Sequence, residues 1–569
     1  MRLTILCGLI VAVLAGSAFA QEATSPQQRG ALADLWLVRS QTITEDLVKD
    51  AAGFTPSGRA LLWARLGQAW WRDDPEKARA WIRKAIEIAE AVPNRENPAE
   101  RNLRLATARL VLNIVAPLDQ KLSKRLIAVL SDDAERVGEA ERRANADGLV
   151  EAAISIVDKD PQRAAELGAA ALRIGHPTPI PWLILRLRSR DVKLGDALFA
   201  QTIEVARQTL DFELINSLSH SIFPESMQPG ASKPALPAEM RTELLKLDLA
   251  FLQANPINAE NRDSICMSVG SFIAPVLVQF ESLLPQQAAI ARQSVNQCQS
   301  KSPLAQQRID EALNNQLLNT VEALLKAGDD TEDQKVRTVY QYRAAAMAKE
   351  KNDFERALKI LDSMSTESRE FMNGAWELIR IEYAILAALG FYKSGDVYGM
   401  RCIISAVPAD LQPLVRIGFV WQLPEERNKE TDPTLEFLTE ARTGLYRSKF
   451  PDAEKWGYYF ALLKLTAKYQ PSEATVDLKE AVAALNRVEQ SKAKETDNDK
   501  PDSLDGVAFS STLPVSLLAM NEYTVREAVS SITSPESRAQ VRLELLKGCL
   551  EKMRSLKQAG ANARPGAAN

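Results

Sequence analysis

Histidine is scarce in this chain, whose 569 residues include only His176 and His220. Zinc sites in proteins are built largely from histidine and cysteine, and neither histidine has a second ligand at metal-site spacing. We therefore expect no metal site. A surplus of one charge is also lacking, since 70 Lys and Arg balance 74 Asp and Glu to a formal net charge of −4. This balance gives no electrostatic reason to expect a nucleic acid or an anionic membrane as partner.

Motifs that mark common catalytic sites are absent. The chain contains no G-x-S-x-G, G-x-x-x-x-G-K, G-x-G-x-x-G or H-E-x-x-H segment. These motifs build nucleophile elbows, phosphate loops, dinucleotide sites and zinc protease sites, respectively. We therefore predict a protein that is not an enzyme and that holds no cofactor. A pair of catalytic carboxylates for glycoside cleavage remains an alternative, because 74 acidic residues form too many possible pairs for the sequence to single one out.

The N-terminus contains an apolar run that is typical of a targeting signal. Met1-Arg2 is followed by the almost wholly apolar residues 3–15, and Ala18-Phe19-Ala20 supplies a small-x-small cleavage pattern. This arrangement predicts a signal peptide over residues 1–20. The alternative, a single-pass anchor, is disfavoured because a spanning helix needs about 20 apolar residues. We expect an exported protein, periplasmic or extracellular, with no integral membrane segment after cleavage.

Four cysteines lie beyond the predicted signal peptide: Cys266, Cys298, Cys402 and Cys549. The first two flank Leu284-Pro285, which has the character of a turn between two helices. At 1.5 Å per residue, the two helices would bring these cysteines within several ångström of the same level. Cys266 and Cys298 are therefore the candidate disulfide in an oxidising compartment. The alternative is that they are small buried hydrophobic residues.

Most of the chain has a helical period. Apolar residues recur at intervals of three and four, as in the stripe Leu62, Leu66, Ala69 and Trp70. Asp74 followed by Pro75 predicts a helix start, because Asp caps the first turn and Pro suits it. The same pair returns 86 residues later at Asp160-Pro161, and half of this distance, 43, is typical of helical-repeat arrays. The predicted fold is all-α.

Two segments resemble the tetratricopeptide repeat (TPR). In 59–93 the resemblance is carried by Trp63, Leu66, Gly67, Trp70, Ala78, Ile82, Ala85 and Pro93. In 336–369 it is carried by residues 352–358, Asn-Asp-Phe-Glu-Arg-Ala-Leu. Trp70 replaces the usual tyrosine, and the turn between the helices is one residue short. The resemblance implies an α-solenoid, a right-handed superhelix of antiparallel helix pairs.

One helix face of the first segment is a candidate binding surface. Trp71 falls opposite the core stripe, beside Leu61, Ala64, Gln68 and Arg72 at helical spacings. In TPR-like arrays this face lines a concave groove, and the resemblance places Tyr342 and Lys349 there in the later segment. The predicted partner-binding residues are Gln68, Trp71, Arg72, Tyr342 and Lys349. The alternative is that Trp71 packs under the N-terminal helix at 30–51.

Composition shifts divide the chain further. The predicted segments are the signal peptide 1–20, a helical-repeat arm 21–223, a Pro-rich loop 224–238, a middle helical segment 239–330, a TPR-like segment 331–490, a flexible charged linker 491–505, C-terminal helices 506–558 and a disordered tail 559–569.

Together these features predict an exported, non-catalytic scaffold that binds a protein or peptide in a concave groove. The alternatives are an α/α-toroid-like enzyme acting on carbohydrate or peptidoglycan, and a purely structural envelope component. A cluster of facing acids in an aromatic cleft would favour the enzyme.

Overall fold

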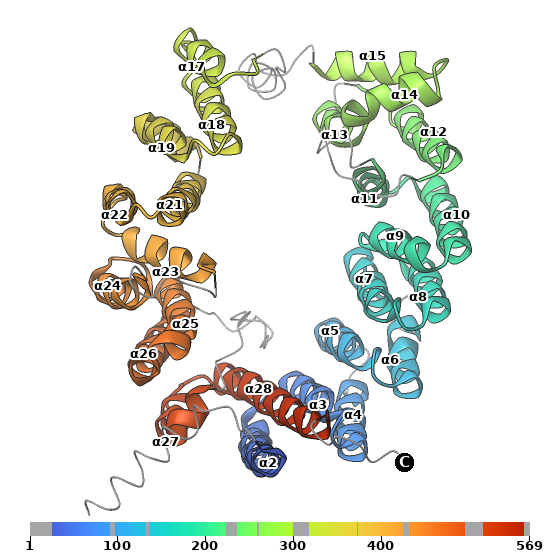
Figure 1. The fold of residues 1–569 in the computed structure, drawn as a ribbon. Coiled ribbons are helices and arrows are strands. Elements are labelled where there is room, and N and C mark those ends of the chain that lie inside the picture. The colour runs from blue at the N-terminus through green and yellow to red at the C-terminus, as the bar shows by residue number, and fades with distance from the viewer. Residues whose placement is uncertain are drawn as a thin grey trace, which may run out of the picture. The chain divides into compact units, whose positions relative to one another are not determined.

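A computed structural model describes most of the chain (Figure 1). The described residues are 25–91, 97–132, 136–223, 236–258, 261–299, 318–372, 374–424, 432–495 and 516–562. They form helices joined by short connections, with no β-strand among them. The all-α prediction is therefore confirmed, while the predicted signal peptide 1–20 lies outside the described residues.

The chain divides into two compact units. One consists of Ala51–Ser302 with Pro501–Ser503, and we call it the 51–302 unit. The other consists of Met1–Asp50, Pro303–Lys500 and Leu504–Asn569, and we call it the 303–569 unit. This division cuts across the predicted segments, since it does not separate the arm 21–223 from residues 239–302 and it groups the first helix with the C-terminal helices.

The 51–302 unit is a stack of helix pairs. Its α-helices are α3 (Pro56–Trp70), α4 (Pro75–Glu90), α5 (Pro98–Val115), α6 (Gln120–Asp132), α7 (Glu139–Ile156), α8 (Pro161–Ile174), α9 (Ile180–Arg190), α10 (Val192–Thr209), α11 (Phe212–Ile222), α12 (Ala238–Ala254), α13 (Arg262–Ser268), α14 (Leu277–Leu283) and α15 (Ala288–Gln299). In Figure 1, α5, α7, α9 and α11 form one row and α6, α8, α10 and α12 form a second row beside it. Each helix thus packs on its pair partner and on the next helix in its row, as a helical repeat requires.

The repeated helix start has the same geometry twice. Asp74 and Asp160 both have φ −145°, with ψ of 80° and 76°, and each carboxylate accepts the backbone N–H three residues later. Close packing inside the first pair depends on Gly67. A Cβ atom there would lie 2.6 Å from Cγ1 of Ile82 and 2.9 Å from the carbonyl oxygen of Ala78. The small residue therefore lets α3 and α4 approach closely, as the sequence indicates.

The last hairpin of this unit contains the disulfide between Cys266 and Cys298. The segment Ser264–Leu283, which includes Cys266, is also long and apolar enough to cross a membrane by length and composition, the one such helix among the residues searched. This segment was not predicted from the sequence. In the structure Phe272 and Phe280 are buried, whereas Met267 and Val278 are 65% and 72% exposed, so one face of the segment packs on the core of the unit. The absence of a membrane segment stays a prediction.

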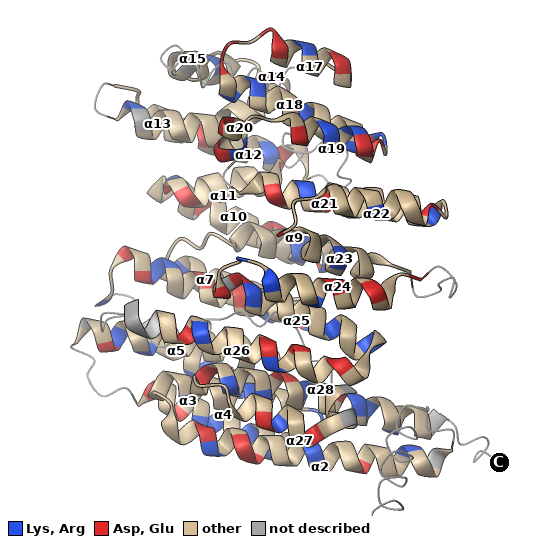
Figure 2. Cartoon of the chain, turned by 90° about the vertical axis from the view of Figure 1, so that its left-hand side faces the viewer, with Lys and Arg blue, Asp and Glu red and all other residues tan. Residues whose placement is uncertain are grey.

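The 303–569 unit is also built from packed helices. They are α2 (Pro26–Asp50), α17 (Val321–Asp329), α18 (Gln334–Glu350), α19 (Phe354–Ser363), α20 (Thr366–Phe371), α21 (Ala375–Lys393), α22 (Val397–Ala406), α23 (Gln412–Gln422), α24 (Thr434–Arg447), α25 (Asp452–Tyr469), α26 (Pro471–Glu495), α27 (Ser516–Ser530) and α28 (Pro535–Asn562). Helix α2 packs along α28, and Figure 2 shows acidic and basic residues interspersed along the helices.

Helix extends further than the sequence predicted at two places. Helix α26 continues to Glu495 and α28 to Asn562, so residues 491–495 of the predicted flexible linker and 559–562 of the predicted tail are helical. Residues 492–495 of the first extension are Lys, Ala, Lys and Glu, all strong helix formers. The remaining residues of both segments, like 224–235 of the predicted Pro-rich loop, lie outside the described residues.

Candidate functional site

Two adjoining pockets lie on the 51–302 unit, one between the start of α7 and the end of α8, and the other between the start of α9 and the length of α11. The arginine pocket has a volume of about 300 Å³ and is lined by Glu139, Arg142, Arg143, Arg173, Ile174, Gly175 and His176. The tryptophan pocket has a volume of about 530 Å³ and is lined by Thr178, Trp182, Glu213, Asn216, Ser217, His220 and Ser221. The ion pair between Arg143 and Glu213 joins their linings.

The connection between α8 and α9 shapes both pockets. Pro177 and Pro179 prevent α8 from continuing through it, and Gly175 lies so close to α7 that a Cβ atom would be 2.9 Å from the carbonyl oxygen of Arg142. The backbone N–H of Thr178 donates to the Asp147 carboxylate of α7 at 2.8 Å. Burial raises the pKa of this carboxyl. The connection is thus held against α7 at two points, which places His176 over the first turn of that helix.

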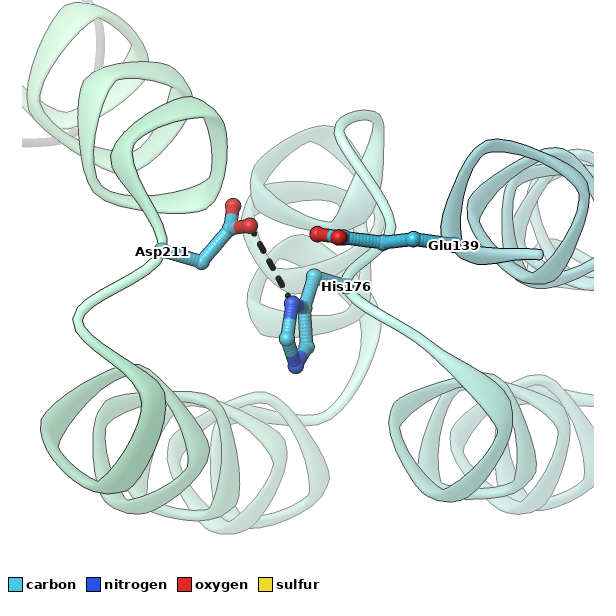
Figure 3. Close-up of side chains that lie close together, drawn as sticks. All are labelled: Glu139, His176 and Asp211. Carbon is cyan, nitrogen blue, oxygen red and sulfur yellow. Dashed lines mark ion pairs between the residues drawn. The ribbon is translucent and has the colours of Figure 1, made fainter.

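Charged side chains from three elements meet beside the arginine pocket (Figure 3). Asp211 caps α11 by accepting the N–H of Leu214 at 2.8 Å, and its other oxygen lies 2.7 Å from Arg143 and 3.2 Å from Nδ1 of His176. Glu139 lies 3.7 Å from Arg143. The cluster is therefore a network in which one guanidinium is shared by several carboxylates.

The same cluster offers three ligand atoms for a metal ion. One atom each of Glu139, His176 and Asp211 lie within 4.8 Å of one another. Sequence spacing gave no sign of this grouping, since the residues are far apart along the chain. However, the Arg143 guanidinium already contacts both carboxylates, and a divalent cation would have to displace it. The arrangement fits an ion-pair network better than a metal centre.

The tryptophan pocket combines an exposed aromatic ring with polar groups. Trp182, on the first turn of α9, is 56% exposed. Nδ1 of His220 lies 2.8 Å from the backbone oxygen of Asn216. Because a carbonyl only accepts, Nδ1 carries a proton and Nε2 of the neutral ring can accept a hydrogen bond. Oδ1 of Asn216 is buried and receives no hydrogen bond within the described part of the chain. The pocket thus combines an aromatic side chain with polar groups that can contact a ligand.

The residues predicted from the sequence lie elsewhere. Gln68 and Arg72 are exposed, but neither lines the two pockets described above. Trp71 is half-buried, with the Arg79 guanidinium 5.1 Å from its ring centre. Leu61 and Ala64, which were predicted to share its open face, are buried. That part of the prediction was wrong, because much of this helix surface packs into the core.

The second predicted pair belongs to the other unit. Tyr342 is 37% exposed, and Lys349 pairs with Glu382 at 2.7 Å. The Lys349 ammonium also lies 5.3 Å from the centre of the Tyr383 ring, and burial raises the pKa of that tyrosine to about 12. Tyr342 and Lys349 thus lie at a partly exposed, charged junction of α18 and α21. Their role in partner binding stays a prediction.

Comparisons with known proteins add no family to this picture. No family model matches the chain, and a search of curated proteins gives no match.

Proposed function

We propose that this protein is an exported scaffold of the TPR-like, α-solenoid kind that binds a segment of another protein. The stacked helix pairs and the repeated Asp-Pro helix starts support a repeat array. Such arrays use exposed side chains of successive helices as binding surfaces. The proposal includes export through the signal peptide predicted at residues 1–20.

The tryptophan pocket is the observation that carries this proposal. Exposed tryptophan is costly to leave in water and is enriched at the centres of binding interfaces. Trp182 and Asn216 line the same pocket, and Oδ1 of Asn216 accepts no hydrogen bond within the described residues, so a peptide that enters the pocket contacts an aromatic side chain and can donate a backbone N–H to the amide oxygen. A ring face next to a hydrogen-bond acceptor suits a peptide, which carries both kinds of group.

The enzyme alternative has less support at this site. Acidic residues do lie near an aromatic ring, as a carbohydrate-cleaving site requires. Yet Asp211 and Glu213 both pair with Arg143, so they act as counter-charges to a guanidinium. A screen of the purified protein against cell-wall glycans tests this alternative directly, and glycan cleavage that is lost on Asp211→Asn would overturn the scaffold proposal.

Crosslinking in the source organism, followed by affinity purification and mass spectrometry, tests the scaffold proposal. We expect a reproducible set of partners with the wild type and its loss with Trp182→Ser. The matched control is Val192→Ser, which removes an apolar side chain that is 53% exposed in the same unit but outside both pockets. A Trp71→Glu variant tests the sequence-predicted surface in parallel.

Two results would contradict the proposal: no partner above background, or equal capture by Trp182→Ser and wild type. N-terminal sequencing of the purified natural protein tests export separately, since cleavage after Ala20 leaves Gln21 first.

A further inference from the structure

Two arginines that line the arginine pocket have no ion-pair partner among the described residues. Arg142, on the first turn of α7, and Arg173, on the last turn of α8, both line it. Neither guanidinium forms an ion pair with any residue in the described ranges, in contrast to Arg143, which is shared by Glu139, Asp211 and Glu213. Arg142 is half-buried and Arg173 is exposed, so both guanidinium groups are available to a ligand in the pocket.

The helix that opens this pocket adds further donors for an anion. Helix α7 has 18 residues and begins after Gly138, whose lack of a side chain leaves the first turn without a side-chain cap. The first N–H groups of a helix have no partner inside it, and together with the helix dipole they favour a negative charge. Most other helix starts in this unit are capped, for example by Asp160 at α8, Asp191 at α10 and Asp211 at α11.

We infer that the arginine pocket binds the phosphate group of a small phosphate ester, held by Arg142 and Arg173 at the start of α7. Two uncompensated charges match the dianion of a phosphate monoester, whereas a single carboxylate would neutralise only one of them. Arginine presents parallel N–H donors that fit two phosphate oxygens at once. This site is independent of the proposed peptide-binding role of Trp182.

The size and the remaining lining of the pocket favour an ester over inorganic phosphate. A volume of about 300 Å³ falls at the lower end of small-molecule sites and leaves room for an organic group. Ile174 supplies an apolar wall, and His176 supplies a ring whose Nδ1 faces Asp211. Nε2 of the same ring is the nitrogen that does not face Asp211 and can form a hydrogen bond with a hydroxyl group of the ligand. Glu139 disfavours a ligand with further negative charge.

Isothermal titration calorimetry of the full protein at low salt tests this inference, with glycerol 3-phosphate, inorganic phosphate and succinate as probes. We expect glycerol 3-phosphate to bind more tightly than the other two. Arg142→Met and Arg173→Met should each weaken its binding about tenfold or more, because each removes charge-assisted hydrogen bonds to the phosphate. Arg186→Met is the matched control, since Arg186 pairs with Asp158 outside the pocket.

The source of the phosphate group is tested with vesicles. Phosphatidylcholine vesicles are compared with vesicles that also contain phosphatidic acid, whose headgroup is a phosphate monoester. Binding to phosphatidic acid that is lost in the Arg142→Met, Arg173→Met double variant identifies a lipid headgroup, whereas binding of glycerol 3-phosphate alone identifies a soluble ester. Unchanged melting temperatures in the variants show that folding is intact.

Three results would overturn the inference. These are no heat of binding for glycerol 3-phosphate with the wild type, binding of succinate as tight as that of the ester, and a double variant that binds the ester as the wild type does.

Discussion

The ion pair between Asp477 and Arg442 should be a principal link between two neighbouring helices of the 303–569 unit. Asp477, on α26, is fully buried, and its two carboxylate oxygens lie 2.6 and 3.0 Å from Nε and Nη2 of Arg442 on α24. This fork geometry is the strongest that an arginine and a carboxylate can adopt. The hydrogen bond from the pair raises the pKa of Arg442. Asp477→Ala removes the carboxylate and leaves the guanidinium in place.

The expected loss of stability follows from what remains after the substitution. The Arg442 side chain is 18% exposed, so most of its charge would lie in the protein without its main partner. Breaking a buried pair by removing one side costs about 3–5 kcal/mol. Glu473 stays 3.5 Å from Arg442 and offsets part of this cost, which favours the lower value of about 3 kcal/mol. For a unit of about 310 residues, whose unfolding entropy is about 2.1 cal/mol/K per residue, the melting temperature should fall by about 4–5 °C.

Urea denaturation followed by circular dichroism measures this change. The control is Glu436→Ala, because the Arg401–Glu436 pair is exposed at 41% and 47% and should contribute less than about 1 kcal/mol. The double variant Arg442→Met, Asp477→Leu should recover most of the loss, since it leaves no unpaired charge. The reasoning is refuted if Asp477→Ala loses no more stability than Glu436→Ala, or if the double variant is as unstable as the single one.

Three further predictions concern buried and paired groups. Burial raises the pKa of Asp248 well above that of an unfolded aspartate, so stability should fall as pH rises from about 4. Asp248→Asn should match the wild type at acid pH and exceed it in urea denaturation at pH about 8; an unchanged pH dependence would contradict this. Iodoacetamide should label Cys402, which is exposed, but not Cys549, which is buried and whose pKa is raised to about 12. Mass spectrometry of the native protein after labelling measures this, and labelling of Cys549 in place of Cys402 would contradict the prediction. Replacing Cys266 and Cys298 by serine should cost about 3–4 kcal/mol, because their disulfide closes a loop with a separation of 32 residues, and equal stability with and without reductant would disprove that contribution.

Most of the helical architecture could be predicted from local sequence patterns. The starts at Asp74 and Asp160 and the close approach at Gly67 depend on residues within one or two helical turns, so periodicity and capping rules could find them. The exposure of the helix face around Trp71 was harder to predict. The helical period correctly separates Trp71 from the apolar stripe of Leu66 and Trp70. However, a helix in a stack is covered on more than one side, and Leu61, on the face predicted to be open, is buried.

The candidate site could not be predicted from local patterns because its parts come from separate helix pairs. Arg143 lies near the start of α7, His176 in the connection after α8, and Asp211 at the cap of α11. Each residue has an ordinary local explanation, such as helix capping for Asp211. Only the stacking of α7, α9 and α11 brings them together. The pair Arg142-Arg143 and the exposed Trp182 were visible in the sequence, but nothing in their spacing sets them apart from other surface residues.

The packing of α2 on α28 also could not be predicted from local sequence patterns, because the two helices lie at opposite ends of the described sequence. Residues 30–51 were predicted to belong to the N-terminal arm 21–223, and consecutive helices usually do pack together. Inside a stack this rule works, since chain connectivity places each helix beside its neighbours. Helix α2 departs from this rule, because it packs along α28, and its Trp36 and Leu47 are buried within the 303–569 unit.

Ion pairs select that distant partner more specifically than apolar contact does. Asp50 pairs with Arg542, Asp46 lies 3.1 Å from Arg526, and Arg39 lies 2.9 Å from Glu522. These contacts join residues separated by 480 to 492 positions along the chain. They are formed only after α27 and α28 have been synthesised, so α2 must remain without its native partner while the repeats between them fold. An apolar stripe read from the sequence can show that α2 needs a partner, but the identity of that partner is a property of the assembled 303–569 unit.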